Sequence, residues 1–185
     1  MDLGRTILRG VAGPLMIGHG AQKLFGWFDG HGLEGTGGFF ESLGMRPGKR
    51  HASVAGAAET AGGALVTLGA LTPLASTLVS AVMITATRKV HIKNGPWVTS
   101  GGWEYTAVML AAMTALAETG PGRPSVDDAL FPRWRGSGWA VASLAAAATG
   151  SWLATEYFNE PEPQIERDPR FTRAPAEAPA EAEAG

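Results

Sequence analysis

The chain has 185 residues, no cysteine and a formal net charge of −2. This length is typical of one domain, and the absence of cysteine excludes disulfides, thiol relays, and zinc or iron–sulfur sites with cysteine ligands. The small net charge and the dispersed lysines and arginines argue against a nucleic-acid partner.

Apolar segments, each close to the ~20 residues that a bilayer core requires, follow one another along the chain. Four of them, and a fifth beyond a polar linker, predict membrane-spanning helices at 6–27, 52–71, 73–92, 103–118 and 138–158. A short amphipathic helix is expected around "GGFFESLG" (37–44), ending at Gly44. The alternative is a soluble bundle of unusually apolar helices. A cleaved signal peptide is disfavoured for the first segment because no good cleavage site follows it.

Ionisable residues interrupt these segments at matching depths. If successive helices alternate in direction, Lys23 lies about 6 Å and His19 about 12 Å inside one surface, at 1.5 Å per residue. Glu59 again lies about 12 Å deep and Arg88 about 6 Å deep in the same half of the bilayer. The opposite ends are nearly bare, since "LGALTPLAS" joins two segments without a charge. These residues are therefore expected to form one polar site.

Charges inside a membrane are costly and should be paired. We expect Glu59 to pair with Lys23 or His19, and Glu104 to pair with Arg88 or His91. Trp97 is a candidate cap over the site. For Trp103 and Tyr105, a place at the rim of the site and a place in an aromatic belt at the headgroup level of the membrane are equally compatible with the sequence. The candidate ligand pocket consists of His19, Gln22, Lys23, Glu59, Arg88, His91, Asn94, Trp97 and Glu104. The competing interpretation is that these groups are structural ion pairs that hold the helices together.

A flat, amphiphilic ligand such as a quinone suits this pocket. Lys23, His19 and Gln22 offer hydrogen-bond donors for carbonyl oxygens, and Glu59 offers a route for protons. Haem is disfavoured because His19 and His91 differ in depth by about 9 Å, and no metal is expected. Without cysteine, metal motif or nucleotide loop, the chain would be at most a quinone-linked oxidoreductase subunit that needs a partner. The alternatives are a scaffold that recruits soluble redox proteins, through its acidic tail or through Asp127 and Asp128, and a small transporter.

Four motifs carry a resemblance to a known family. In order, "HGAQKLFGWFDGHGLEGTGGFFESLGMRPG", "AGAAETAGGALVTLGALTPLAS", "VHIKNGPWVTSGGWEY" and "ALAETGPGRPSVDDAL" resemble the DoxX family of small bacterial inner-membrane proteins, over roughly residues 5–130. The resemblance implies a multi-pass four-helix bundle in the bacterial plasma (inner) membrane. It also implies a link to oxidative stress and quinone-linked redox chemistry, with superoxide dismutase and a sulfurtransferase as soluble partners. The recurrent polar positions of the family correspond to His19, Gln22, Lys23, Glu59, His91, Asn94 and Glu104.

The sequence thus predicts an all-α, integral membrane four-helix bundle with two additions. Residues 1–130 form the DoxX-like transmembrane bundle, and residues 131–158 form the end of a linker and an extra, fifth transmembrane helix. Residues 159–185 are rich in proline, alanine and glutamate. Such a composition cannot bury enough apolar surface to offset its ordering entropy, which predicts a disordered tail.

Overall fold

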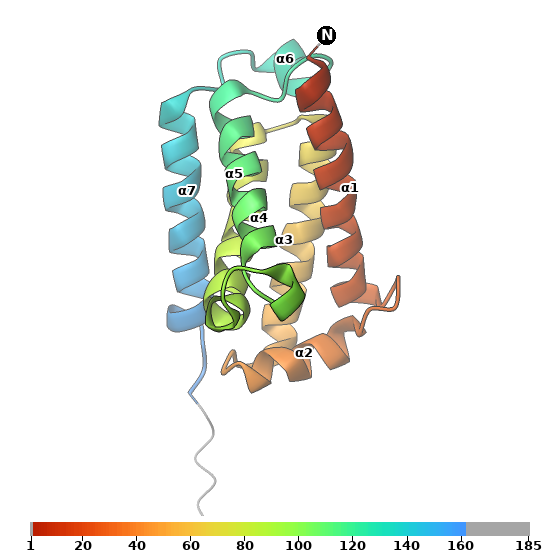
Figure 1. The fold of residues 1–185 in the computed structure, drawn as a ribbon, viewed down its shortest axis with the longest axis vertical. Coiled ribbons are helices and arrows are strands. Elements are labelled where there is room, and N and C mark those ends of the chain that lie inside the picture. Colours follow the sequence, from red (N-terminus) through yellow and green to blue (C-terminus); the bar gives the residue numbers. More distant parts are fainter. Residues whose placement is uncertain (1, 162–185) are drawn as a thin grey trace, which may run out of the picture.

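The structure is a computed structural model that describes residues 2–161, and every regular element within them is helical (Figure 1). This confirms the prediction of an all-α chain. Of the predicted tail, residues 162–185 lie outside the described residues. The α-helices, in chain order, are α1 (Leu3–Phe25), α2 (Gly32–Ser42), α3 (Gly48–Leu68), α4 (Thr72–Ala86), α5 (Glu104–Thr119), α6 (Val126–Leu130) and α7 (Ser137–Trp152).

Short turns extend two of these helices and shape one loop. The π-helical turn η1 (Thr87–His91) continues α4, and η4 (Leu153–Tyr157) continues α7. Two 3-10 turns, η2 (Ile92–Asn94) and η3 (Val98–Ser100), lie in the loop before α5. Each of the five long predicted segments coincides with a helix, and α2 takes the place of the predicted amphipathic helix.

The helices differ from the expectation that each segment spans a bilayer. Within residues 2–161, no helix is at once long enough and apolar enough to pass through a membrane. α1 has 23 residues but carries Arg5, Arg9 and Lys23. α5 and α7 have 16 residues each, fewer than the ~20 of a typical span.

α1 and α3 run antiparallel and touch through backbone at two glycine contacts. A Cβ atom added to Gly20 would lie 2.6 Å from the carbonyl oxygen of Gly56, and one added to Gly13 would lie 2.7 Å from that of Gly63. The two contacts are two helical turns apart on each helix, so they lie on one face. Small residues permit this close approach, and it brings α1 beside Glu59.

α4 lies at the centre of the bundle, where it packs against α3, α5 and α7 (Figure 1). The buried core around it is rich in methionine, whose flexible side chain fills irregular gaps. α2 crosses the lower end of the bundle in Figure 1, and α6 covers the upper end beside the start of α1. The largest fully buried apolar side chains are Met16, Val79, Met113 and Leu116.

Polar contacts hold the upper end together, so the prediction of a nearly bare end is wrong. Arg9 is 5% exposed, and its Nη2 donates a hydrogen bond to the carbonyl oxygen of Pro124 at 2.7 Å. Asp127 is 2% exposed, and its two carboxylate oxygens each accept a backbone N–H at 2.7 Å, from Leu71 and Thr72. Asp127 therefore caps the start of α4 from a distant part of the chain.

The burial of Asp127 also bears on the hypothesis that Asp127 and Asp128 recruit soluble redox proteins. Asp127 is committed to α4 and cannot present its carboxylate to a soluble protein. Asp128 accepts a hydrogen bond from Arg123 Nε at 2.9 Å. Arg123 in turn donates its backbone N–H to Asp2, and this hydrogen bond, followed by that from Arg5, holds the pKa of Asp2 below its ordinary value. All three aspartates of this end are thus engaged in contacts within the protein, and Asp2 ties α1 to the loop before α6.

Candidate functional site

An ion pair between α1 and α3 forms the centre of the candidate site. Lys23 Nζ lies 2.9 Å from Oε1 and 2.7 Å from Oε2 of Glu59. Glu59 is 3% exposed, whereas the Lys23 side chain is 22% exposed. Oε1 accepts a hydrogen bond from the ammonium group, but the buried Oε2 accepts none from a described residue. The predicted pairing of Glu59 with Lys23 is confirmed, and loss of one partner would leave the other buried charge uncompensated.

His19 and Tyr105 border this pair. His19 precedes Lys23 by one helical turn and is close enough to interact electrostatically with Glu59. Its ring centroid lies 6.1 Å from that of Tyr105, near the start of α5. Tyr105 interacts with the charge of Glu59 as well. Tyr105, for which the sequence left the site and an aromatic belt equally open, therefore lies beside the buried carboxylate of Glu59.

Gln22 has a different role from its helix neighbour Lys23. Its Nε2 donates a hydrogen bond to the carbonyl oxygen of Phe28 at 3.1 Å, which steadies the turn after α1. Gln22 and Lys23 also line a hollow of about 260 Å³, whose other polar lining residues include Asp29 and His31. Lys23 thus lies between this polar hollow and the buried Glu59.

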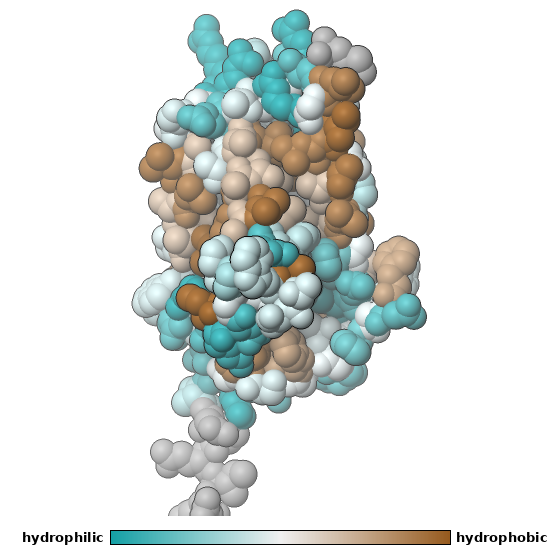
Figure 2. Space-filling model, viewed as in Figure 1, coloured by the Kyte–Doolittle hydropathy of each residue, from teal (hydrophilic) through white to brown (hydrophobic). Residues whose placement is uncertain are grey.

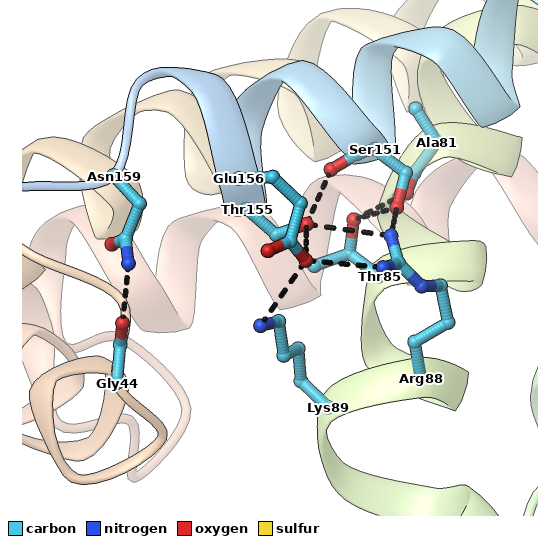
Figure 3. Close-up of polar contacts among 9 residues, drawn as sticks. All are labelled: Gly44, Ala81, Thr85, Arg88, Lys89, Ser151, Thr155, Glu156 and Asn159. Carbon is cyan, nitrogen blue, oxygen red and sulfur yellow. Dashed lines mark hydrogen bonds and ion pairs between the residues drawn. The ribbon is translucent and has the colours of Figure 1, made fainter.

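Arg88 reaches toward α7 rather than toward Glu104, its predicted partner (Figure 3). Arg88 Nη2 lies 3.2 Å from Glu156 Oε1, and Nη1 lies 3.4 Å from Ser151 Oγ and 3.3 Å from Thr155 Oγ1. Within residues 2–161, Glu104 makes no ion pair. Glu156 lies in the fifth predicted segment, whereas the predicted pairs joined residues of the first four segments only.

The remaining predicted pocket residues belong to the loop before α5. His91 Nδ1 and Asn94 Nδ2 both contact the carbonyl oxygen of Gly101, at 2.7 and 3.2 Å. Glu104 begins α5 and donates its backbone N–H to a carbonyl group within the same loop. Trp97, the predicted cap, is 66% exposed. The described contacts therefore join His19, Lys23 and Glu59, whereas those of His91, Asn94 and Glu104 lie within their own loop.

A cavity of about 400 Å³ lies next to the ion pair, between α2, α3, α4 and α7. Its walls are mainly apolar, and its polar lining side chains come from α1, α3, α4, η1 and α7. His51 and Lys89, which were not among the predicted pocket residues, also line the cavity. His51 lies just before the second predicted segment, which begins at residue 52. The lining residues of the cavity include Lys23, Phe39, Val54, Ala58, Glu59, Leu78, Val82, Lys89 and Ser151.

A family model described as DoxX matches residues 4–92. Neither a curated protein nor a solved structure matches the chain. The matched residues run from α1 to η1, and they contain the Lys23–Glu59 pair together with most of the cavity wall. The contribution of α7 to that wall lies beyond the matched residues.

Proposed function

The chain belongs to the DoxX family through residues 4–92, and we propose on this basis that it is a membrane subunit of a redox system. Members of this family are typically membrane-associated. In our proposal the cavity beside Lys23 and Glu59 holds a quinone or a similar lipid-soluble carrier. The observation that carries the proposal is an apolar cavity of about 400 Å³ with a buried ion pair in its wall.

The apolar outer surface supports a membrane location. Figure 2 shows hydrophobic surface over the middle of the bundle and hydrophilic surface at its upper and lower ends. Along α1 the exposed apolar residues recur every four positions, which places them on one stripe. Soluble monomers seldom expose large contiguous apolar patches. The residues of this stripe, each more than half exposed, are Leu3, Ile7, Val11 and Leu15.

The polar residues within the helices are compatible with this location. Arg9 is 5% exposed and Glu59 is 3% exposed, so both side chains face the interior of the bundle. The average hydropathy of a single helix includes such residues, although lipid would not contact them. Polar groups that face the inside of a bundle are the usual arrangement in membrane proteins. We therefore propose a multi-pass protein of the bacterial inner membrane.

The chemistry of the cavity suits a quinone with an apolar chain. The chain would lie along apolar residues such as Val54, Leu78 and Val82. Lys23 can donate a hydrogen bond to a carbonyl oxygen, and Glu59 can accept or release a proton next to it. A bound quinone would supply the electron-carrying chemistry that these side chains lack. Because the chain has no cysteine, we propose that electrons come from a partner protein, with superoxide dismutase and a sulfurtransferase as candidate members of the complex.

The proposal is tested by filling the cavity. Ala58 lines it, whereas the neighbouring Ala57 is exposed and does not. Wild type, Ala58→Phe and the matched control Ala57→Phe would be purified in mild detergent, and bound quinones would be quantified by mass spectrometry. We expect wild type and Ala57→Phe to retain quinone and Ala58→Phe to lose most of it. A wild-type protein without quinone, or equal retention by both variants, would contradict the carrier function.

A further inference from the structure

The lower edge of the cavity carries two adjacent cations from η1. Lys89 lines the cavity, and Arg88 lies next to it on the side of α7. Both face Glu156, whose Oε1 lies 3.2 Å from Arg88 Nη2 and 3.6 Å from Lys89 Nζ (Figure 3). The hydroxyl of Thr155 also donates a hydrogen bond to this oxygen, at 3.1 Å. One carboxylate oxygen is thus bound by two cations and a hydroxyl group, which is a typical set of anion ligands.

Arg88 would keep its position without Glu156. Its Nη1 contacts the hydroxyl oxygens of Ser151 and Thr155, and each of these residues is 1% exposed. Ser151 is fixed in turn by Thr85, whose hydroxyl donates a hydrogen bond to Ser151 Oγ at 2.9 Å. Neutral, buried groups therefore orient the guanidinium group for an anion.

Glu156 is suited to be exchanged for another anion. Its side chain is 44% exposed, and ion pairs at such exposure are weak. Glu156 carries one negative charge and faces two positive side chains, so Arg88 and Lys89 together retain an excess of positive charge. The following residues are held separately, since Asn159 Nδ2 donates to the carbonyl oxygen of Gly44 at 2.8 Å (Figure 3). Glu156 can therefore turn away while the segment after it stays in place.

We propose that Arg88 and Lys89 form a binding site for the phosphate group of an anionic phospholipid, and that Glu156 competes for this site. Basic pockets between helices at a membrane surface recognise such headgroups. Because Lys89 also lines the cavity, the lipid would lie at its entrance. Glu156 and α7 lie outside the residues matched by the DoxX family model, so the competing carboxylate comes from the unmatched part of the chain. The inference relies on the proposed membrane location and not on quinone binding.

The test measures lipid preference in the full-length protein. Wild type and variants in mild detergent are incubated with equal amounts of phosphatidylglycerol and phosphatidylcholine with identical acyl chains, and retained lipids are counted by native mass spectrometry. We expect wild type to prefer phosphatidylglycerol. Glu156→Gln should raise this preference roughly fivefold, the effect of about one charge near a membrane surface. Arg88→Gln combined with Lys89→Gln should abolish it.

Lys93→Gln is the matched control, because Lys93 is exposed and makes no ion pair within the described part of the chain. Its preference should equal that of wild type. An equal loss of lipid preference in Lys93→Gln would mean that general positive surface charge selects the lipid, and this would overturn the specific site. An unchanged preference in Glu156→Gln would overturn it as well. Displacement of the lipid by millimolar inorganic phosphate would reassign the site to a free anion. Release of the protein from membranes by carbonate would instead contradict the membrane location.

Discussion

At the residue scale, the two neighbouring aspartates of α6 have different surroundings. Asp127 is buried and accepts the N–H groups of Leu71 and Thr72, while the Asp128 side chain is 28% exposed and pairs with Arg123. Hydrogen bonds to a buried charge contribute more to stability than an exposed ion pair does. Replacing each aspartate in turn by asparagine therefore distinguishes the contribution of the α4 cap to stability from that of a surface ion pair.

We predict that Asp127→Asn lowers the free energy of unfolding by about 2 kcal/mol, because the amide keeps one accepting oxygen for the two backbone N–H groups and turns an NH2 donor toward the other. Asp128→Asn should lower it by less than about 1 kcal/mol. Thermal unfolding in detergent, followed by circular dichroism, would register the first change as a drop of about 4–8 °C in Tm. Equal drops in the two variants would show that Asp127 has no special role in starting α4.

A predicted ion pair was confirmed only where both partners lie within regular helices. Lys23 and Glu59 could be matched because depth along a helix follows directly from residue number. Arg88 could not be matched in this way, because its partner Glu156 lies in η4, beyond the four segments whose depths were compared. The Lys89 side chain was missed for a related reason. The π-helical turn η1 changes the facing of its residues, and regular helical spacing does not predict such a turn.

At the element scale, the α1–α3 contact depends on glycines with very different surroundings. A Cβ atom on Gly20 would lie 2.1 Å from Thr60 Oγ1 and 2.6 Å from the carbonyl oxygen of Gly56, whereas Gly18 of the same helix has open space around it. Gly18 therefore tests the intrinsic effect of alanine in α1, and Gly20 tests the effect of separating the two helices.

We predict that Gly20→Ala destabilises the protein by about 1–3 kcal/mol, because the backbones of α1 and α3 must move apart. Gly18→Ala should instead be neutral or stabilise it by up to about 1 kcal/mol, since alanine is the better helix former. Urea or thermal unfolding of both variants in the same detergent would measure the difference. A Gly20→Ala protein as stable as wild type would disprove the close backbone contact.

The helices were predictable because apolar runs, glycine stops and proline starts are local signals. α4, for example, was predicted to begin at Pro73 and has this proline in its first turn. α6 was not predicted, because a helix of only 5 residues carries too few positions to show a period. Its role also depends on contacts with α4, which lie far away in the sequence.

At the scale of the whole molecule, the hydrophobic surface over the middle of the bundle in Figure 2 predicts which positions of α1 would lie deep in a membrane. Val11 is 55% exposed in the middle of the α1 stripe, and Leu3 is 61% exposed at its end. A lysine near the end of a helix can extend its ammonium group toward the polar surface, while one in the middle cannot. The two positions are therefore a matched pair for testing whether lipid covers the α1 stripe.

We predict that Val11→Lys opposes membrane insertion by about 3 kcal/mol and reduces the protein recovered in the carbonate-resistant membrane fraction. Leu3→Lys should leave this recovery close to that of wild type. If both variants insert as well as wild type, the stripe does not contact acyl chains. Immunoblots of extracted membranes, normalised to total protein, provide the measurement.

The long reach of the Asp127 carboxylate has a consequence for synthesis on the ribosome. The carboxylate that completes the first turn of α4 is 55 residues beyond Thr72. During synthesis, the backbone N–H groups of that turn have no Asp127 carboxylate to bind until translation has passed α5. A recombinant fragment that ends near residue 92 would never receive it, so expression trials should extend at least through α6.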